Sequence, residues 1–112
     1  MTLTTGAYHS ASGWPEVEAV PNVFRRVLSC GDDIMVVQFR IGRGAEVPAH
    51  THPHEQVGYV VSGRMKFRIG DEVRELGPGD GYSVPGGVTH GAEGVTDCIA
   101  VDSFHPVRED YR

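Results

Sequence analysis

The chain has 112 residues, which is enough for one domain with a single hydrophobic core and too few for two. Its 10 basic and 15 acidic residues give a formal net charge of −5, and no basic run occurs, so nucleic acid is not an expected partner. No apolar run approaches the ~20 residues that span a bilayer, and the first residues lack the pattern of a signal peptide. We therefore expect a cytoplasmic protein with no membrane partner.

Glycine and cysteine contents constrain the fold further. The 15 glycines are about twice the usual share and, with seven prolines, indicate many turns and short strands. The two cysteines, Cys30 and Cys98, lie in apolar surroundings that suit buried thiols, and they are too few for a disulfide framework.

Two segments of different character divide the chain. Residues 1–21 are polar and irregular in pattern, and we interpret them as an N-terminal arm ahead of a single domain at residues 22–112. Trp14, the only tryptophan, is expected to anchor this arm on the domain or on a partner subunit. A loosely ordered terminus is the alternative.

From residue 22 onward, apolar residues recur with period two, which is typical of strands with one buried face. Between residues 34 and 41, for example, Met35, Val37, Phe39 and Ile41 share a face. No segment shows the 3.6-residue period of a helix, and about eight short strands separated by turns indicate an all-β sandwich or barrel. The strands predicted from the pattern are Val23–Leu28, Ile34–Ile41, Val57–Val61, Arg64–Ile69, Val73–Leu76, Tyr82–Val84 and Val95–Phe104.

One short segment, HTHPHEQ at residues 50–56, holds three imidazoles, a carboxylate and an amide. If it is extended, His50 and His52 share a face about 6 to 7 Å apart along the strand. Because neutral imidazole is a common ligand of transition metals, this geometry suits a metal ion. A solvated, histidine-rich loop is the alternative.

Two longer stretches carry a resemblance to a known family. GAEVPAHTHPHEQVGYVVSG (residues 44–63) is similar to the first cupin motif: glycine, five residues, His-x-His, three residues, an acidic or amide ligand, six residues, glycine. GDGYSVPGGVTH (residues 79–90) is similar to the second: glycine, five residues, proline, x, glycine, two residues, histidine. The resemblance implies a double-stranded β-helix barrel of jelly-roll type, with a metal inside its mouth, usually as a homodimer.

The resemblance also implies the ligands of one divalent transition metal ion, which is zinc, nickel, manganese or iron. The implied ligands are His50, His52, Gln56 and His90. The commonest cupin residue at position 56 is glutamate. The amide of Gln56 leaves the ion with charge +2 instead of near +1, which favours binding of an acidic substrate over oxygen activation.

Other positions of the two motifs are expected to lie outside the metal centre. Glu55 precedes Gln56 and would therefore face away from the site on a strand. His54 follows Pro53, which bends the path of the chain, and is expected at the surface or rim. The second motif often ends in asparagine, and this position is Gly94 here.

The C-terminal stretch DSFHPVRED (residues 102–110) narrows the prediction. If Asp102 and Phe104 share a face with Cys98 and Ala100, they point into the barrel. A carboxylate in such apolar surroundings needs a partner, either Arg108 or the metal. A structural ion pair between Asp102 and Arg108 is the alternative to a catalytic role.

With HPHEQVGYVVSG, this tail resembles the cupins known as pectin degradation proteins, which open and ketonise 4,5-unsaturated uronates. The resemblance implies catalytic roles for Asp102, Phe104 and Arg108. His105 and Val107 depart from the small or proline residues expected there.

The mechanism expected from these residues acts on a small acidic, uronate-like substrate. The metal binds substrate oxygens, Arg108 pairs with the carboxylate, Asp102 moves a proton to C4, and Phe104 packs on the ring. Two other functions stay open: a metal-dependent dioxygenase of a small organic substrate, and a non-catalytic cupin that binds a small molecule.

Overall fold

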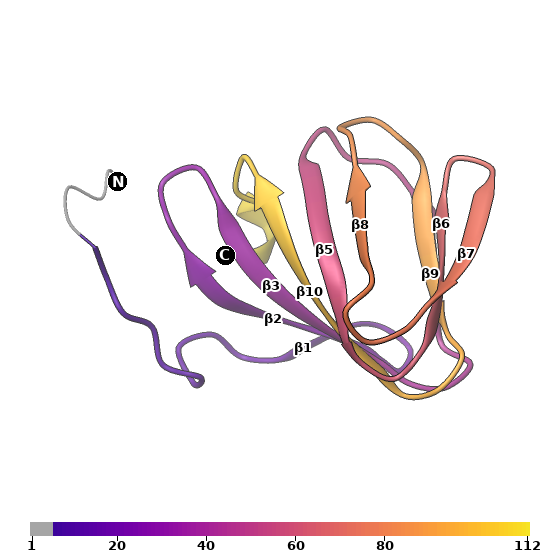
Figure 1. The fold of residues 1–112 in the computed structure, drawn as a ribbon. Coiled ribbons are helices and arrows are strands. Elements are labelled where there is room, and N and C mark those ends of the chain that lie inside the picture. Colours follow the sequence, from indigo (N-terminus) through magenta and orange to yellow (C-terminus); the bar gives the residue numbers. More distant parts are fainter. Residues whose placement is uncertain (1–5) are drawn as a thin grey trace.

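The protein, seen here as a computed structural model that describes residues 6–112, is built from two antiparallel β-sheets that face each other (Figure 1). The elements in this range are β1 (Val17–Val20), β2 (Val23–Cys30), β3 (Met35–Ile41), β4 (Glu46–His50), β5 (Glu55–Ser62), β6 (Met65–Ile69), β7 (Glu72–Leu76), β8 (Gly81–Val84), β9 (His90–Gly94), β10 (Cys98–His105) and the 3-10 helix η1 (Glu109–Tyr111). One sheet has the order β1-β2-β3-β10-β5-β8 and the other β4-β9-β6-β7. The predicted all-β, double-stranded barrel is therefore confirmed.

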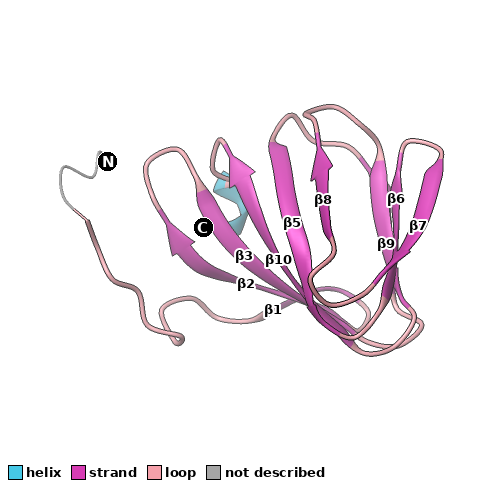
Figure 2. Cartoon of the chain, in the orientation of Figure 1, coloured by secondary structure: helices cyan, strands magenta, loops and turns pink. Residues whose placement is uncertain are grey.

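Helical structure is confined to the end of the described chain, where η1 follows the last strand (Figure 2). No helix in residues 6–112 is long and apolar enough to cross a membrane. Both cysteines are free thiols, and Cys98 is buried while Cys30 is half-buried.

The predicted strands are present with ends shifted by a few residues, but β1, β4 and β9 were not predicted. The last strand was expected from Val95, whereas β10 begins at Cys98 after a bend, and β9 lies before that bend. Strand β9 was not predicted because its sequence, HGAEG, contains two glycines and lacks the apolar alternation of a strand. Gly91 is needed there, since a Cβ at this position would lie 2.8 Å from the Val47 carbonyl oxygen of β4.

The end of the predicted N-terminal arm is part of the sheet, because β1 pairs with β2. Trp14 packs against a buried cluster of Val27, Met35, Val37, Phe104 and Val107. Trp14 thus contacts the core of the domain, as the predicted anchor of the arm would. The division of the chain at residue 22 stays a prediction.

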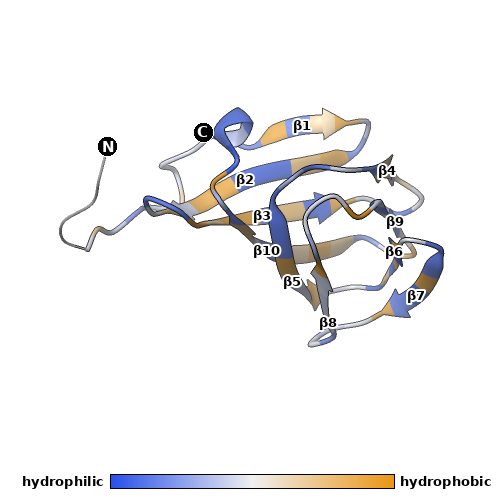
Figure 3. Ribbon diagram, turned by 90° about the horizontal axis from the view of Figure 1, so that it is seen from above, coloured by the Kyte–Doolittle hydropathy of each residue, from blue (hydrophilic) through white to orange (hydrophobic). Residues whose placement is uncertain are grey.

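Along β10 and β5, buried residues alternate with more exposed ones, and this alternation determines which side chains face the interior. Both strands carry hydrophobic and hydrophilic residues (Figure 3). On β10, Asp102 and Phe104 are buried on the same face as Cys98 and Ala100, as predicted. On β5, Gln56 is buried, whereas its neighbours along the strand are exposed. The fold thus directs one amide and one carboxylate into the space between the sheets.

We predict that Val60→Ala, at a side chain with no solvent exposure, lowers the free energy of unfolding by about 2 kcal/mol. The cost comes from lost apolar burial and from the cavity that is left. Val73→Ala, at a residue 55% exposed, is the matched control and should change it by no more than about 0.5 kcal/mol. Urea unfolding of the metal-free protein measures both, and equal effects would contradict the assigned core.

Candidate metal centre

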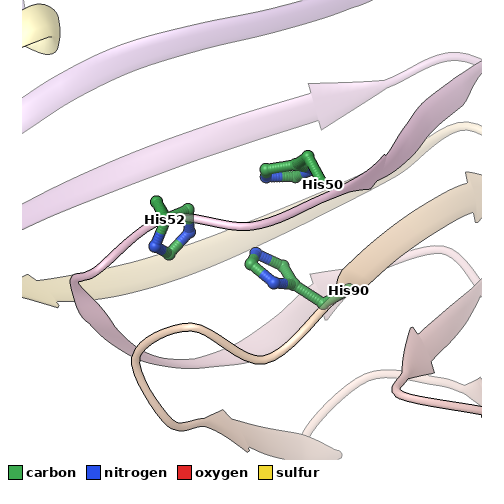
Figure 4. A group of neighbouring side chains, drawn as sticks. All are labelled: His50, His52 and His90. Atoms are coloured by element: carbon green, nitrogen blue, oxygen red, sulfur yellow. The ribbon is translucent and has the colours of Figure 1, made fainter.

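The side chains of three histidines, His50, His52 and His90, lie close together (Figure 4). His50 ends β4, His52 lies in the following loop, and His90 begins β9. Their potential ligand atoms all lie within 4.8 Å of one another. His50 and His90 are brought together because they are register partners in the β4–β9 pair.

The three rings share an arrangement of hydrogen bonds that determines their tautomers. In each ring, Nδ1 lies within hydrogen-bond distance of a backbone carbonyl oxygen two residues away. The distances are 2.8 Å from His50 to Pro48, 3.1 Å from His52 to His54 and 2.9 Å from His90 to Val88. Since a carbonyl oxygen only accepts, Nδ1 carries the hydrogen, and Nε2 of each neutral ring keeps its lone pair for a metal ion.

Gln56 contributes a fourth candidate ligand atom. Its Oε1 lies 3.1 Å from Nε2 of His52, so two acceptor atoms face each other with no hydrogen between them. Nε2 of His90 is also buried and has no hydrogen-bond partner within the described part of the chain. A bound cation removes both conflicts, so three imidazole nitrogens and an amide oxygen fit a divalent transition metal ion.

Burial keeps two of the rings neutral, as metal binding requires. The pKa of His52 is lowered to about 4, first by burial and then by the positive charge of Arg108. The pKa of His90 is also lowered, chiefly by burial. At neutral pH, these imidazoles therefore need not release a proton before they bind a cation.

Asp102 lies beside this group as a buried carboxylate, with 2% of its surface exposed. Its Oδ1 accepts a hydrogen bond from the Tyr82 hydroxyl, and its Oδ2 accepts one from the amide nitrogen of Gln56. Burial raises the pKa of Asp102 to about 6, although the two hydrogen bonds oppose this effect. The carboxyl group can therefore take either protonation state near neutral pH.

Arg108 is not the partner of Asp102. No ion pair joins the two residues within the described range, so the alternative of a structural pair between them is wrong. Instead, Nε and Nη2 of Arg108 bond the carboxylate of Asp110 at 3.1 and 3.0 Å. Nη1 is buried and has no hydrogen-bond partner among the described residues.

The polar groups line one pocket with about 470 Å³ of space, including its open mouth. Its wall is otherwise apolar and comes from both sheets, which is typical of a small-molecule site. The polar side chains in the wall are His50, Gln56, Tyr82, His90, Asp102, Arg108 and Tyr111, and the apolar ones include Phe39, Ile41, Val47, Met65, Phe67 and Phe104.

The cupin domain family model matches residues 37–104, which is more than half of the chain. The chain belongs to the cupin family. It is 30% identical over 99 residues to the pectin degradation protein KdgF of Dickeya dadantii, covering 87% of this chain and 90% of that protein.

Two solved structures are similar to this cupin over nearly its whole length. The structure of KdgF from Halomonas sp. has a TM-score of 0.89 at 32% identity and covers 96% of this chain and 100% of that one. An RmlC-like cupin from Shewanella frigidimarina has a TM-score of 0.88 at 30% identity, with coverage of 96% and 97%.

The structure brings most of the predicted residues of this cupin together. His50, His52 and His90 form the histidine group, and Gln56 lies next to them, but its role as a ligand stays a prediction. Glu55 is exposed, as expected from its place on the strand. His54 is half-buried, with its ring 5.5 Å from that of His52 and outside the group.

Sequence reasoning missed Tyr82 and Asp110. Tyr82 shares the inward face of β8 with the buried Val84, and an inward tyrosine needs a partner for its hydroxyl. The alternation of buried and exposed residues along β8 was therefore the sequence signal that could have identified Tyr82. Nothing in the sequence distinguished Asp110 from the other acidic residues of the tail.

We predict that His52→Ala weakens binding of a divalent transition metal by more than the roughly 10–100-fold typical of a lost outer partner, because a ligand itself is removed. His54→Ala is the matched control from the same motif and should leave the affinity unchanged. Competition against a chelator, with Zn²⁺ or Ni²⁺, measures both. Equal losses in the two variants would contradict the assigned ligands.

We predict that the His52 ring titrates near pH 4 in the metal-free protein, as read from NMR shifts of the imidazole. Since this value lies below the 6.5 of a free ring, the neutral ring contributes stability above pH 6.5 that is lost as the pH falls through about 4. His52→Gln should reduce this acid sensitivity. A midpoint at or above 6.5 would refute the burial argument.

Proposed function

We propose that this cupin converts 4,5-unsaturated uronates to their linear keto form, with a divalent metal ion held by His50, His52, Gln56 and His90. The observation that carries this proposal is that Arg108, which has one guanidinium nitrogen without a partner among the described residues, and the buried Asp102 line the same pocket as His50 and His90. The similarity to the pectin degradation proteins named KdgF supports it.

Arg108 is the residue that binds the substrate carboxylate. Arg108 lines the pocket, and its Nη1 is buried and has no partner among the described residues, while Nε and Nη2 are held by Asp110. The guanidinium carbon lies 4.2 Å from the centre of the Tyr111 ring and 5.3 Å from that of Phe104. These contacts orient the group, so that a carboxylate gains a charge-assisted hydrogen bond at little cost in side-chain entropy.

Asp102 is the residue that moves the proton. Ring opening moves the proton of the hemiacetal hydroxyl at C1 to Asp102, breaks the bond from C1 to the ring oxygen and leaves an aldehyde at C1 and an enolate across C4 and C5. Ketonisation then returns the proton from Asp102 to C4, so the reaction neither consumes nor releases protons overall. A carboxyl group with a pKa of about 6 can accept the first proton and deliver the second near neutral pH.

Phe104 and the metal ion complete the site. Phe104 is 1% exposed, lines the pocket and lies 5.7 Å from the His52 ring, so it limits the access of water to the reacting atoms. When bound, a divalent ion supplies a Lewis acid for substrate oxygens. Because Gln56 adds no negative charge, this Lewis acidity is stronger than with a carboxylate ligand.

We also propose that the protein is a homodimer that uses the outer face of β5. Val57, Tyr59 and Val61 are 44%, 48% and 43% exposed and lie on the same face of this strand. Such a row of exposed apolar side chains on one strand is more typical of an interface than of a solvated surface.

We predict that the purified protein, loaded with metal, accelerates the loss of ultraviolet absorbance of unsaturated galacturonate. Asp102→Ala should reduce kcat by roughly 10² to 10⁴-fold, because general acid–base catalysis is lost. Arg108→Ala should raise KM, because the carboxylate loses its partner. Both are measured at saturating metal.

Glu55→Gln, at an exposed carboxylate, is the control and should match the wild type. A wild-type rate no faster than that of buffer would refute the proposed reaction. Oxygen consumption with substrate, followed with an oxygen electrode, would instead support a dioxygenase. Binding of the uronate without turnover would support a non-catalytic binding protein.

A further inference from the structure

Tyr82 has no role in the proposed reaction, but it is hydrogen-bonded to Asp102, the residue that also holds the candidate metal ligand Gln56. Its hydroxyl donates to Oδ1 of Asp102, whose Oδ2 accepts from the Gln56 amide nitrogen. These hydrogen bonds join three adjacent strands, β8, β10 and β5, next to the histidine group. Both oxygens of a fully buried carboxylate are therefore occupied by donors from the protein.

Gly58 makes this connection possible. It is the register partner of both Tyr82 on β8 and Asp102 on β10, so it lies between them in the sheet. A Cβ at Gly58 would collide with Oδ1 of Asp102. The missing side chain leaves the space through which Tyr82 reaches across one strand to the carboxylate.

The ring of Tyr82 is itself held in place. It stacks on Phe67 of the opposite sheet, with centroids 4.0 Å apart and an interplanar angle of 3°. The hydroxyl is a donor at all physiological pH values, because burial raises the pKa of Tyr82 further above its ordinary value. Tyr82 therefore presents a fixed hydrogen to Asp102.

This arrangement determines which end of the Gln56 amide faces the histidines. A carboxylate only accepts, so the amide nitrogen must point to Asp102 and the amide oxygen must point the other way. That oxygen lies 3.1 Å from Nε2 of His52. If Asp102 turned away, the amide could rotate by half a turn and present its nitrogen, which cannot bind a metal ion.

We propose that Tyr82 is a positioning residue for the metal centre: through Asp102, it fixes the Gln56 amide with its oxygen toward the three imidazole nitrogens. This inference rests on the metal site of the proposed function and not on the uronate reaction. It also explains why an amide suits position 56, since a carboxylate there would face the carboxylate of Asp102 with no hydrogen between them.

Cobalt binding to the metal-free protein tests this role without substrate. Affinity for Co²⁺ is measured by competition against a chelator, and coordination by the visible absorption spectrum. Tyr82→Phe keeps the ring that stacks on Phe67 and removes only the donor. We expect it to weaken Co²⁺ binding roughly threefold to tenfold and to alter the spectrum, a smaller effect than the roughly 10–100-fold typical of a direct outer partner.

The matched control is Tyr8→Phe, at an exposed tyrosine of the N-terminal segment, which should bind Co²⁺ as the wild type does. A purely structural role of Tyr82 would lower the unfolding midpoint of the metal-free protein and leave Co²⁺ affinity and spectrum unchanged. That result, or no change at all, would overturn the proposal while leaving the metal site intact. A wild type that binds no Co²⁺ would overturn both.

A double-mutant cycle tests the direction of the hydrogen bonds. Asp102→Asn removes one acceptor and should weaken Co²⁺ binding in the wild type. In the Gln56→Glu background, the same change supplies a donor to the new carboxylate, so its cost in affinity should be at least threefold smaller. Equal costs in the two backgrounds would show that Asp102 does not orient position 56.

Discussion

The burial of the Asp102 carboxylate is the constraint on which the rest of the site depends. A carboxylate removed from water is costly unless donors replace the lost hydration. Here the donors come from β5 and β8, the two strands that follow β10 across the sheet, and Gly58 leaves room for one of them. Satisfying this single group therefore determines the residues at several positions on three strands.

The same hydrogen bonds separate charge from metal coordination. With a glutamate ligand, the negative charge would lie on the metal itself. In this cupin an amide faces the histidines, and the carboxylate lies one hydrogen bond further out, on Asp102. In the proposed function, an ion held there keeps its full positive charge for substrate oxygens, while the negative charge and the exchange of a proton belong to Asp102. In the proposed function, Gln56 thus coordinates the metal ion and Asp102 carries the negative charge, whereas a single glutamate ligand would do both.

Local spacing explains how much of this site the sequence could predict. His50 and His52 are two residues apart, and the second motif holds His90 at a fixed distance from its glycines, so the histidine group could be recognised from short patterns. The inward direction of Asp102 followed from the alternation along its strand. Each of these features depends on geometry within one strand or one turn.

What could not be predicted depends on register between strands. Tyr82 and Asp102 meet over Gly58 because β5 pairs with β8 on one side and with β10 on the other. The register of these two pairs cannot be predicted from the sequence of any one strand. Strand β9 was missed for a related reason, because close backbone approach to β4 selects glycine where strand patterns require β-branched residues.

The C-terminal tail shows how a wrong pairing in the prediction changes the chemistry. Arg108 and Asp102 were expected as possible partners because both are charged and near in sequence. The chain instead continues from β10 into η1, where the carboxylate of Asp110 accepts two hydrogen bonds from Arg108. The ring centre of Tyr111 lies 4.2 Å from the guanidinium carbon of Arg108 and 4.2 Å from that of Arg25. Two of the three guanidinium nitrogens of Arg108 thus form hydrogen bonds within the C-terminal tail, and the third, Nη1, has no hydrogen-bond partner among the described residues. An arginine paired with Asp102 would hold this carboxyl group ionised and use its own unpaired donor, whereas the observed arrangement leaves both groups with the roles that the proposed function assigns to them.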